Sequence, residues 1–297
     1  MRISFQTGYR NTLAEIERTN ADLAKYQQQI SSGKRLEVPS DDPTAAVGAV
    51  KEHTEIGTLD QFTQSADSAN SRLTVIDTVL SDVINKLTQA QATTASAMGN
   101  TATAQQRISA ADDLAGIRDS LFASFNTMFR GTYLFGGTDT TTSPYVQNPD
   151  GSIGAYLGTT TAQSVDINRQ KAVQVTYNAD GITRGADATD VFGVLQNLIA
   201  DVQSGNQANM QTGMDALKRA FDRAVSTQSK VGTDENAVAD EESRLDAMRR
   251  AAAARLSSEE DTNMAAAITG LSAADTAHKA ALGAAATINK LSLLDYL

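Results

Sequence analysis

The 297-residue sequence has no cysteine and no tryptophan, only four prolines, and only 5% aromatic residues. The lack of cysteine excludes disulfides and thiolate metal sites. It suits a reducing compartment, and it equally suits a chain threaded unfolded through a channel, where a disulfide would obstruct passage. A compact enzyme core usually holds more aromatic mass, whereas Ala and Leu alone interdigitate well between helices. The composition therefore favours a helical bundle.

Long hydrophobic runs and basic clusters are absent as well. Residues 1–9 contain no apolar signal-sequence core, and no stretch approaches about 18 consecutive apolar residues. We therefore expect no cleavable secretory signal and no membrane insertion. The formal net charge is -10, and the 25 basic residues are scattered. Because a phosphate-binding face needs clustered Lys and Arg, we expect no nucleic-acid partner.

Catalytic and metal-binding signatures are also missing. His53 and His278 are the only histidines and lie far apart in the sequence. His278 falls on the apolar stripe of the expected last helix, where a packing role is far commoner than metal ligation. No nucleophile stands beside a recognisable base, and no glycine-rich phosphate motif is complete. We expect no catalytic residue, no cofactor and no metal, and hence not an enzyme; an enzyme on a helical scaffold is the most distant alternative.

The dominant pattern is a heptad repeat between residues 59 and 97. No Pro or Gly interrupts it, so it predicts an α-helix from about residue 43 to 97, roughly 80 Å long. Val79 and Ile84 flank the seam, so the helix should contact more than one partner. The repeating apolar positions are Leu59, Phe62, Ala66, Ala69, Leu73, Ile76, Leu80, Val83, Leu87 and Ala90.

The first 30 residues carry a weaker helical pattern. Polar residues such as Asn20 occupy positions where a stable coiled coil would have Leu, so this helix should be marginal without a partner. Its narrow apolar stripe consists of Tyr9, Ile16, Leu23 and Ile30.

The segment between these two helices is predicted to be a capping turn. Gly33 can end the first helix in a left-handed conformation, and Asp42 followed by Pro43 is an N-cap signal. No His or third carboxylate stands at ligand spacing, so we favour capping over a metal or catalytic role for the acidic pair. The turn residues are Gly33, Pro39, Ser40, Asp41, Asp42 and Pro43.

This part of the chain resembles the flagellin superfamily. A polar first helix, the string SSGKRLEVPSDDPTAA and a long heptad helix are similar to the start of that family. The opening MRIS and the ending LSLLDYL resemble the branch found where hook and filament meet, since flagellins usually end in Leu-Leu-Arg or Leu-Leu-Gln. The string GTYLFGG at residues 131–137 resembles the point where the family's rod leads into a projecting β domain.

After Gly136 and Gly137 the composition changes, and Gly, Thr, Asn, Asp and Pro dominate to about residue 190. Apolar residues alternate at positions 165–167 and 173–177, between turn signals at 148–151 and 178–181. The two glycines are not followed by a phosphate-binding helix, so we interpret them as a hinge. The pattern predicts a small antiparallel β domain held by its attachment to the rod.

Helical patterns surround this insert. One spans about residues 104–130, and a short one, capped by Asp187 or Asp190, ends near Val202. A long one has an apolar row at Leu217, Ala224, Val231, Val238, Leu245 and Ala252, and Gly232 should interrupt it at a cost of about 1 kcal/mol. A capping signal at residues 257–261 predicts a last helix from about 259 to 288, before an apolar tail at 291–297 that is costly to expose.

The expected fold is mainly α, a long antiparallel helical bundle or coiled-coil rod from the N- and C-terminal segments with a small inserted antiparallel β domain. Its segments are a terminal helix and turn (1–42), two rod parts (43–135 and 187–256), the β insert (136–186) and a C-terminal helix (257–297). The expected rod core is Leu59, Phe62, Leu73, Ile76, Leu80, Val83, Leu87, Leu121, Phe125, Leu217, Val238 and Leu245.

The resemblance implies a structural motility protein of the bacterial flagellum that joins hook-associated protein 1 to the flagellin filament. It implies export through the flagellar type III apparatus with a chaperone, an extracellular location, and a ring of copies whose terminal helices order on assembly. The expected assembly interface is Ile3, Tyr9, Ile16, Leu23, Ile30, Ile268, Leu271, Leu282, Ile288, Leu291, Leu294 and Tyr296.

Two other hypotheses stay open. A flagellin filament subunit would polymerise alone into long filaments, whereas a junction protein should form at most one ring. An intracellular coiled-coil scaffold would have stably folded ends and no export, and it leaves the apolar C-terminus and the β insert unexplained.

Overall fold

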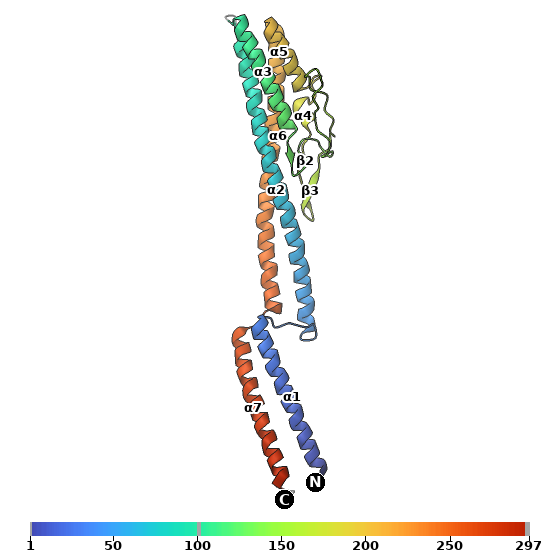
Figure 1. Cartoon of the computed structure of the whole chain (residues 1–297), viewed down its shortest axis with the longest axis vertical. Coiled ribbons are helices and arrows are strands. Elements are labelled where there is room, and N and C mark those ends of the chain that lie inside the picture. The colour runs from blue at the N-terminus through green and yellow to red at the C-terminus, as the bar shows by residue number, and fades with distance from the viewer. Residues whose placement is uncertain (1, 100–101, 295–297) are drawn as a thin grey trace. The chain divides into compact units, whose positions relative to one another are not determined.

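A computed structural model describes residues 2–99 and 102–294, and the side chains of residues 7–99 and 102–287 (Figure 1). These residues form seven helices and two small antiparallel sheets, which confirms the predicted mainly α fold. None of the described helices is both long and apolar enough to span a membrane. The chain divides into unit 1, Met1–Leu59 with Met248–Leu297, and unit 2, Asp60–Ala247. The five segments expected from sequence stay a prediction.

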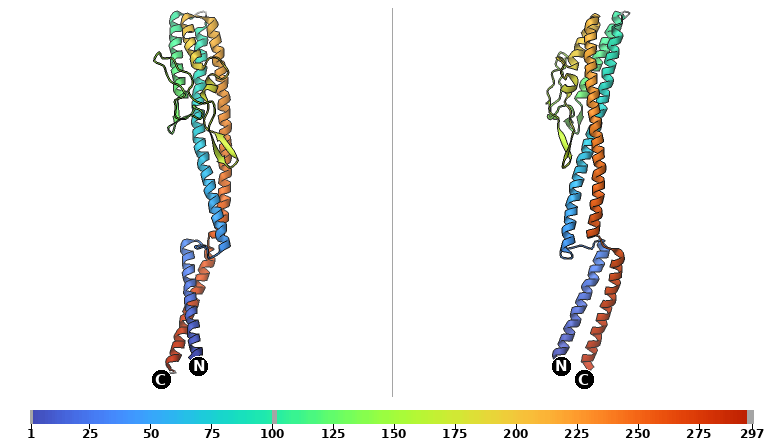
Figure 2. Two further views of the ribbon diagram at one scale, coloured as in Figure 1. Left: turned by 90° about the vertical axis from the view of Figure 1, so that its right-hand side faces the viewer. Right: turned by 180° about the vertical axis from the view of Figure 1, so that it is seen from behind.

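Unit 1 contains the two terminal helices, α1 (Arg2–Ser32) and α7 (Met264–Leu294). They contact each other and run antiparallel, so the start of α1 and the end of α7 lie at the same end of the pair (Figures 1 and 2). α1 ends at Gly33, whose φ of +73° is the left-handed conformation of a glycine cap. The Thr262 N–H donates to the Gly33 carbonyl at 2.9 Å and ties the start of the α7 segment to this cap.

The turn after Gly33 leads into α2 (Pro43–Ala97) and is held by its two aspartates. Asp42 Oδ1 accepts the Ala45 N–H at 3.1 Å, which is N-cap geometry. Asp41 Oδ2 closes the turn by accepting the Val38 N–H at 3.2 Å. These backbone hydrogen bonds hold the pKa of both carboxyls below the ordinary value. The aspartates therefore act as capping groups.

The last two helices break later than the sequence predicts. α6 (Gln207–Glu260) continues through the expected start at residues 257–259, and α7 begins only after Asn263, whose Oδ1 accepts the Ala266 N–H at 3.1 Å. Ser258 Oγ donates backward to the Arg255 carbonyl at 2.7 Å, so this hydroxyl extends α6 instead of capping a new helix. Gly232 does not break α6 either.

Unit 2 is built on residues 60–97 of α2 and 207–247 of α6, with α3 (Ala104–Phe125) and α5 (Val191–Ser204) packed into the same core (Figure 1). Thr103 caps α3 in a capping box with Gln106, and Asp190 caps α5 by accepting the Gly193 N–H at 2.8 Å. The buried rod residues are Leu59, Leu73, Ile76, Leu80, Val83, Leu87, Leu121, Phe125, Leu217, Val238 and Leu245; Phe62 is only partly buried.

α3 ends at Phe125, five residues before its predicted end, because Asn126 binds a distant part of the chain. Asn126 Nδ2 donates to the Tyr145 carbonyl at 3.0 Å, and Asn126 Oδ1 accepts the Tyr145 N–H at 3.0 Å. The chain then turns through β1 (Met128–Phe129) and β2 (Thr132–Tyr133), which pair antiparallel. The side-chain amide thus replaces the next helical turn with an anchor for the insert.

The insert holds little regular structure. β3 (Ser164–Asn168) and β4 (Lys171–Gln174) form an antiparallel hairpin with Val165 opposite Val173, as the alternating pattern predicts. The signal at residues 178–181 is not a turn: Asn178 Oδ1 accepts the Asp180 N–H at 2.8 Å and caps α4 (Ala179–Thr183).

Close backbone packing explains the two glycines at the start of the insert. A Cβ at Gly136 would lie 2.1 Å from the Asp139 carbonyl oxygen, and one at Gly137, whose φ is +70°, would lie 2.2 Å from the Thr159 carbonyl oxygen. Both are buried. They serve a tight crossing of two segments, and the interpretation of the two glycines as a hinge stays a prediction.

An aromatic cluster joins the insert to the helices of unit 2. Tyr145 is 1% exposed, and its ring lies 4.7 Å from that of Phe192 and 6.3 Å from that of Phe125 in edge-on contacts. Its hydroxyl pairs with Thr183 Oγ1 at 2.7 Å, and burial raises its pKa. The insert therefore shares a core with α3 and α5. The sequence predicts only a domain held by its attachment to the rod.

Candidate assembly interface

The contact between α1 and α7 is made mainly by small side chains of α7. Ala267 and Ala274 are buried at 3% and 8% exposure, and Leu271 is partly buried. On α1, Leu23 and Ile30 are only partly buried. An interface of this kind lets the helices approach closely, and each alanine buries less apolar area than a larger side chain would.

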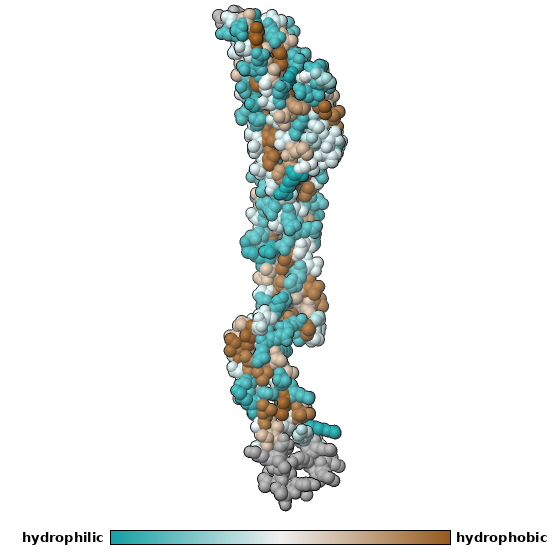
Figure 3. Space-filling model, in the orientation of Figure 1, coloured by the Kyte–Doolittle hydropathy of each residue, from teal (hydrophilic) through white to brown (hydrophobic). Residues whose placement is uncertain are grey.

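Several large apolar side chains of these helices remain outside the contact. The exposed fraction is 46% at Leu13, 50% at Tyr9, 52% at Ile268 and 47% at Leu282. Apolar patches are visible on the face of the molecule in Figure 3, where the grey atoms are not described. These exposed apolar side chains are candidates for contact with another molecule.

A network of charged groups fixes the turn of unit 1 beside this surface. Lys34 Nζ pairs with Glu260, and His53 Nε2 lies 3.0 Å from the other oxygen of the same carboxylate. Arg35 donates to the Glu259 carbonyl at 2.7 Å and lies 3.2 Å from Asp42. The Lys34 hydrogen bond holds the pKa of Glu260 below its ordinary value. The acidic end of α6 is thus neutralised by the turn that follows α1.

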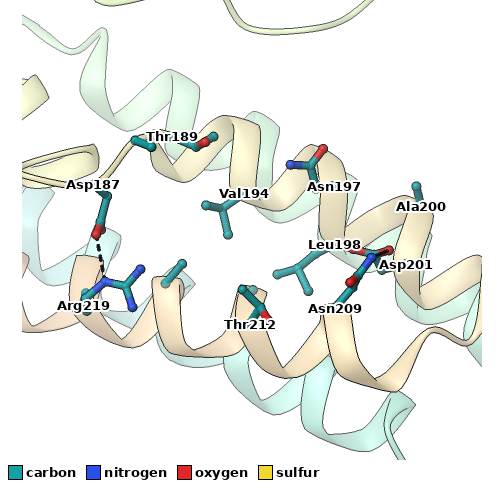
Figure 4. Close-up of a pocket in the computed structure, with 13 residues that line it drawn as sticks. Asp187, Thr189, Val194, Asn197, Leu198, Ala200, Asp201, Asn209, Thr212 and Arg219 are labelled. Carbon is teal, nitrogen blue, oxygen red and sulfur yellow. Dashed lines mark hydrogen bonds and ion pairs between the residues drawn. The ribbon is translucent and has the colours of Figure 1, made fainter.

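Unit 2 has a surface pocket of about 460 Å³ between α5 and α6 (Figure 4). Arg219 Nε donates to Asp187 Oδ1 at 2.9 Å at one end, and Asn209 Nδ2 donates to Asp201 Oδ1 at 2.9 Å at the other. Leu198 lies between them. The Asp187 and Asp201 carboxylates of the pocket are thus both hydrogen-bonded. Within the described ranges, no group of three or more His, Cys, Asp or Glu is placed to hold a metal. The pocket offers no catalytic arrangement.

Comparison with known proteins identifies the chain. Residues 3–140 match the bacterial flagellin N-terminal helical region. The sequence is 30% identical over 259 residues to flagellar hook-associated protein 3 of Escherichia coli strain K12, covering 80% of each protein. The chain belongs to the flagellar hook-associated protein 3 family. Flagellar hook-associated protein 3 of Salmonella typhimurium is also 30% identical, over 254 residues, 78% of this chain and 80% of that protein.

Solved structures of similar fold agree with membership in the flagellar hook-associated protein 3 family. A putative flagellar hook-associated protein from Vibrio parahaemolyticus gives a TM-score of 0.70 at 19% identity, covering 74% of this chain and all of that one. The flagellar junction protein FlgL from Legionella pneumophila gives a TM-score of 0.60 at 14% identity, covering 72% of this chain and 100% of that one. At these identities the likeness shows the fold alone.

Membership in the flagellar hook-associated protein 3 family makes the chain a structural protein of the bacterial flagellum. The sequence-based prediction of a structural motility protein at the hook and filament junction is thereby confirmed. Family membership also implies association with other flagellar components, and the named partners are considered below.

The predicted interface residues fall into three groups. Tyr9, Ile268 and Leu282 are exposed, and Ile16, Leu23, Ile30 and Leu271 are partly buried. Ile3, Ile288, Leu291 and Leu294 lie on the described backbone of α1 and α7, and their side chains lie outside the described ones. Tyr296 lies outside the described residues.

The predicted turn residues lie together between α1 and α2. Pro39 and Ser40 are at its exposed tip, and Pro43 is the first residue of α2. Sequence reasoning missed Val47 and Val50, which are 72% and 66% exposed near the start of α2. Their spacing of three residues outside the heptad rows is the signal that could have found them. It also missed Thr19, a polar residue buried between the terminal helices.

Proposed function

We propose that α1 and α7 form the surface through which copies of this chain assemble into a ring between hook and filament. The observation that supports this is the contrast on α7: alanines make the contact with α1, while Ile268 and Leu282 stay exposed. Burial of one such side chain against a neighbour contributes about 1.5–3 kcal/mol. A few side chains per copy are enough to favour assembly once neighbouring copies meet.

In this proposal one side of the ring contacts hook-associated protein 1 and the other contacts flagellin. The ring lies outside the cell, and the chain reaches it through the flagellar type III export apparatus. A chain without cysteine passes such a channel without disulfides to reduce. In the ring, the terminal helices of neighbouring copies assemble with one another, and the rod and the insert face outward.

Marginal terminal helices suit this route. The contact between α1 and α7 is made largely by alanines, so the pair gains stability from neighbours that bury the exposed residues. An export chaperone covers the C-terminal region, where Ile268 and Leu282 are exposed, and keeps free chains from associating early.

A reconstitution assay tests the junction role. Hooks carrying hook-associated protein 1 are incubated with this chain and then with flagellin from the same bacterium, and filaments are counted by electron microscopy. Growth should require this chain, and Leu13→Ser with Ile268→Ser should lower it about tenfold or more, as expected for the loss of two apolar contacts. Val225→Ser is the matched control, since Val225 is 38% exposed on α6 in unit 2.

Two outcomes would support other functions. Long filaments formed by this chain alone would favour a flagellin subunit. Terminal helices that resist limited proteolysis in the free chain, together with no effect on filament growth, would favour a self-contained coiled-coil scaffold.

A further inference from the structure

The terminal helices of unit 1 meet at three successive levels. At the first, the Thr262 N–H donates to the Gly33 carbonyl. At the second, the Tyr26 ring lies on Gly270, and at the third, Thr19 pairs with His278. Seven residues back along α1, from Tyr26 to Thr19, correspond to eight residues forward along α7. All three contacts therefore belong to one antiparallel register.

The second contact depends on the absence of a side chain. A Cβ built at Gly270 would lie 2.6 Å from Cε1 and Cζ of Tyr26, closer than real Cβ contacts. The ring of Tyr26 thus lies directly over Gly270, and a side chain at this position would require the end of the Tyr26 side chain to move. Other described glycines of the two helices, Gly8 and Gly283, have no neighbour within 4 Å of such a Cβ.

The third contact is a hydrogen bond inside the apolar seam. Thr19 is 5% exposed, and its Oγ1 lies 3.0 Å from His278 Nδ1. The Thr19 hydroxyl has one proton, which it donates to the Ile16 carbonyl at 3.1 Å. We assign His278 the tautomer with Nδ1 protonated, so that Nδ1 donates to the Thr19 hydroxyl. Loss of this pair removes one of the two hydrogen bonds of the buried hydroxyl, which is destabilising even though the bond to the Ile16 carbonyl remains.

The buried alanines of α7 do not define a register. Ala267, Ala274 and Ala281 repeat at seven residues, so a slip of one heptad puts alanine against the same positions of α1. The short link between α6 and α7 does not prevent this, because either helix can gain or lose turns at the break. An interface of alanines alone gives little energy difference between such registers.

Slipped registers lose both specific contacts. One slip of seven residues brings Ala277 opposite Tyr26 and Ala285 opposite Thr19. The other brings Asn263 opposite Tyr26 and Leu271 opposite Thr19. In each case the ring meets a side chain in place of the glycine, and the buried hydroxyl faces an apolar residue.

We propose that Thr19, Tyr26, Gly270 and His278 are positioning residues that fix the register of α1 against α7. In this register Leu13 and Leu282 come within about one helical turn of the same level, whereas a heptad slip displaces them by about 10 Å. The consequence for the assembly surface rests on the proposed function. The register itself does not.

Disulfide trapping in the full chain tests the register, since the natural sequence has no cysteine to interfere. The pair Leu23→Cys with Ala274→Cys reports the observed register, and Leu23→Cys with Ala281→Cys or with Ala267→Cys reports a slip in either direction. Intramolecular disulfides are measured by mass spectrometry of monomers after brief mild oxidation at low concentration. The first pair should form about tenfold faster than the other two, as expected when a hydrogen bond and a steric fit favour one state.

The same pairs are then measured with Thr19→Val, Gly270→Ala and His278→Leu combined. The rate ratio should fall to about threefold or less when these preferences are removed. Thr12→Val with Gly283→Ala is the matched control and should leave the ratio unchanged, because Thr12 donates only to the Gly8 carbonyl of its own helix. Thr19→Ser, which keeps the hydroxyl, should also retain it.

Equal rates for the three pairs in the otherwise unchanged chain would overturn the proposal, because no register would then be preferred. A ratio that survives the triple change would also overturn it and would assign the register to the contact at Gly33. A preserved ratio in a chain that fails to support filament growth would instead contradict the junction role alone.

Discussion

Apolar residues recur every seven positions in the helix pair of unit 1 and in the helical core of unit 2. Large apolar side chains are buried in unit 2, whereas several are exposed in unit 1. In unit 2, large side chains such as Leu80 and Phe125 are at most 1% exposed. In unit 1, an alanine such as Ala267 makes the helix contact, while Leu13 and Ile268 are exposed. Because burial of a large apolar side chain contributes about 1.5–3 kcal/mol, unit 2 is stabilised by its own core. Unit 1 leaves much of its apolar surface uncovered.

The strongest test of this difference removes the insert. Deleting residues 138–184 takes Tyr145 out of the core and uncovers Phe125 and Phe192. Loss of one buried aromatic side chain alone costs about 3–5 kcal/mol, so the free energy of unfolding should fall by at least that amount. Urea denaturation followed by circular dichroism measures the change.

Removal of only the exposed turn at residues 149–151 is the matched control and should have a small effect. Unchanged melting of the helices after the larger deletion would instead show that the insert is a separate domain held only by its attachment. That was the expectation from sequence alone.

A pair of Leu substitutions compares the two units directly. Leu80→Ala should lower the free energy of unfolding by about 2–5 kcal/mol, because Leu80 is fully buried in α2. Leu13→Ala on α1 should change it by about 0.5 kcal/mol or less, because Leu13 is 46% exposed. Equal losses at the two positions, in the same denaturation experiment, would contradict the different roles assigned to the two helix surfaces.

The core of unit 2 could be predicted from the sequence because a heptad row is a local signal within one helix. A heptad row such as that of Leu73 and Leu80 must be buried on one side of a helix, whatever the partner. Helix ends were predicted less well. α3 ends at Phe125 because Asn126 binds the backbone of Tyr145, 19 residues away, and no pattern within α3 contains that information.

The candidate interface shows the same limit. Its apolar stripe was visible in the spacing of Ile16, Leu23 and Ile30. The pairing of Thr19 with His278 joins residues 259 positions apart, and neither helix indicates from its own sequence which residue will face it. Register between two distant helices is decided by three-dimensional fit, so it appears only in the structure.

Alanine substitutions at two glycines of unit 2 should change the stability in opposite directions. Gly137→Ala should destabilise the chain by about 1–3 kcal/mol, because its φ is +70° and the new Cβ would lie 2.2 Å from the Thr159 carbonyl oxygen. Gly116→Ala should stabilise α3 by up to about 1 kcal/mol, because Gly116 is an exposed helical residue with nothing within 4 Å. Opposite shifts of the thermal midpoint are expected, and shifts of the same sign would contradict the close crossing at Gly137.

The smallest expected effects concern two glutamates whose pKa values move in opposite directions. The Lys34 hydrogen bond lowers the pKa of Glu260 in unit 1, so this carboxylate stabilises the fold above the ordinary Glu pKa of about 4.3, and its contribution is lost as the pH falls through the lowered value. Burial, and then the charge of Asp77, raise the pKa of Glu235 in unit 2. Its folded state binds the proton more tightly, so its contribution is full below the ordinary pKa and is lost as the pH rises through the raised value.

Amide substitutions separate these two contributions. Glu260→Gln should lower the free energy of unfolding at pH 7, and the difference from the unchanged chain should shrink as the pH falls through the lowered pKa of Glu260. Glu235→Gln should raise it at pH 7, because the amide removes a charge held in a partly buried site near Asp77, and this difference should also shrink in acid. Urea denaturation at pH 7 and in acid measures the four differences. A loss of stability at pH 7 in both variants would contradict the unfavourable charge assigned to Glu235.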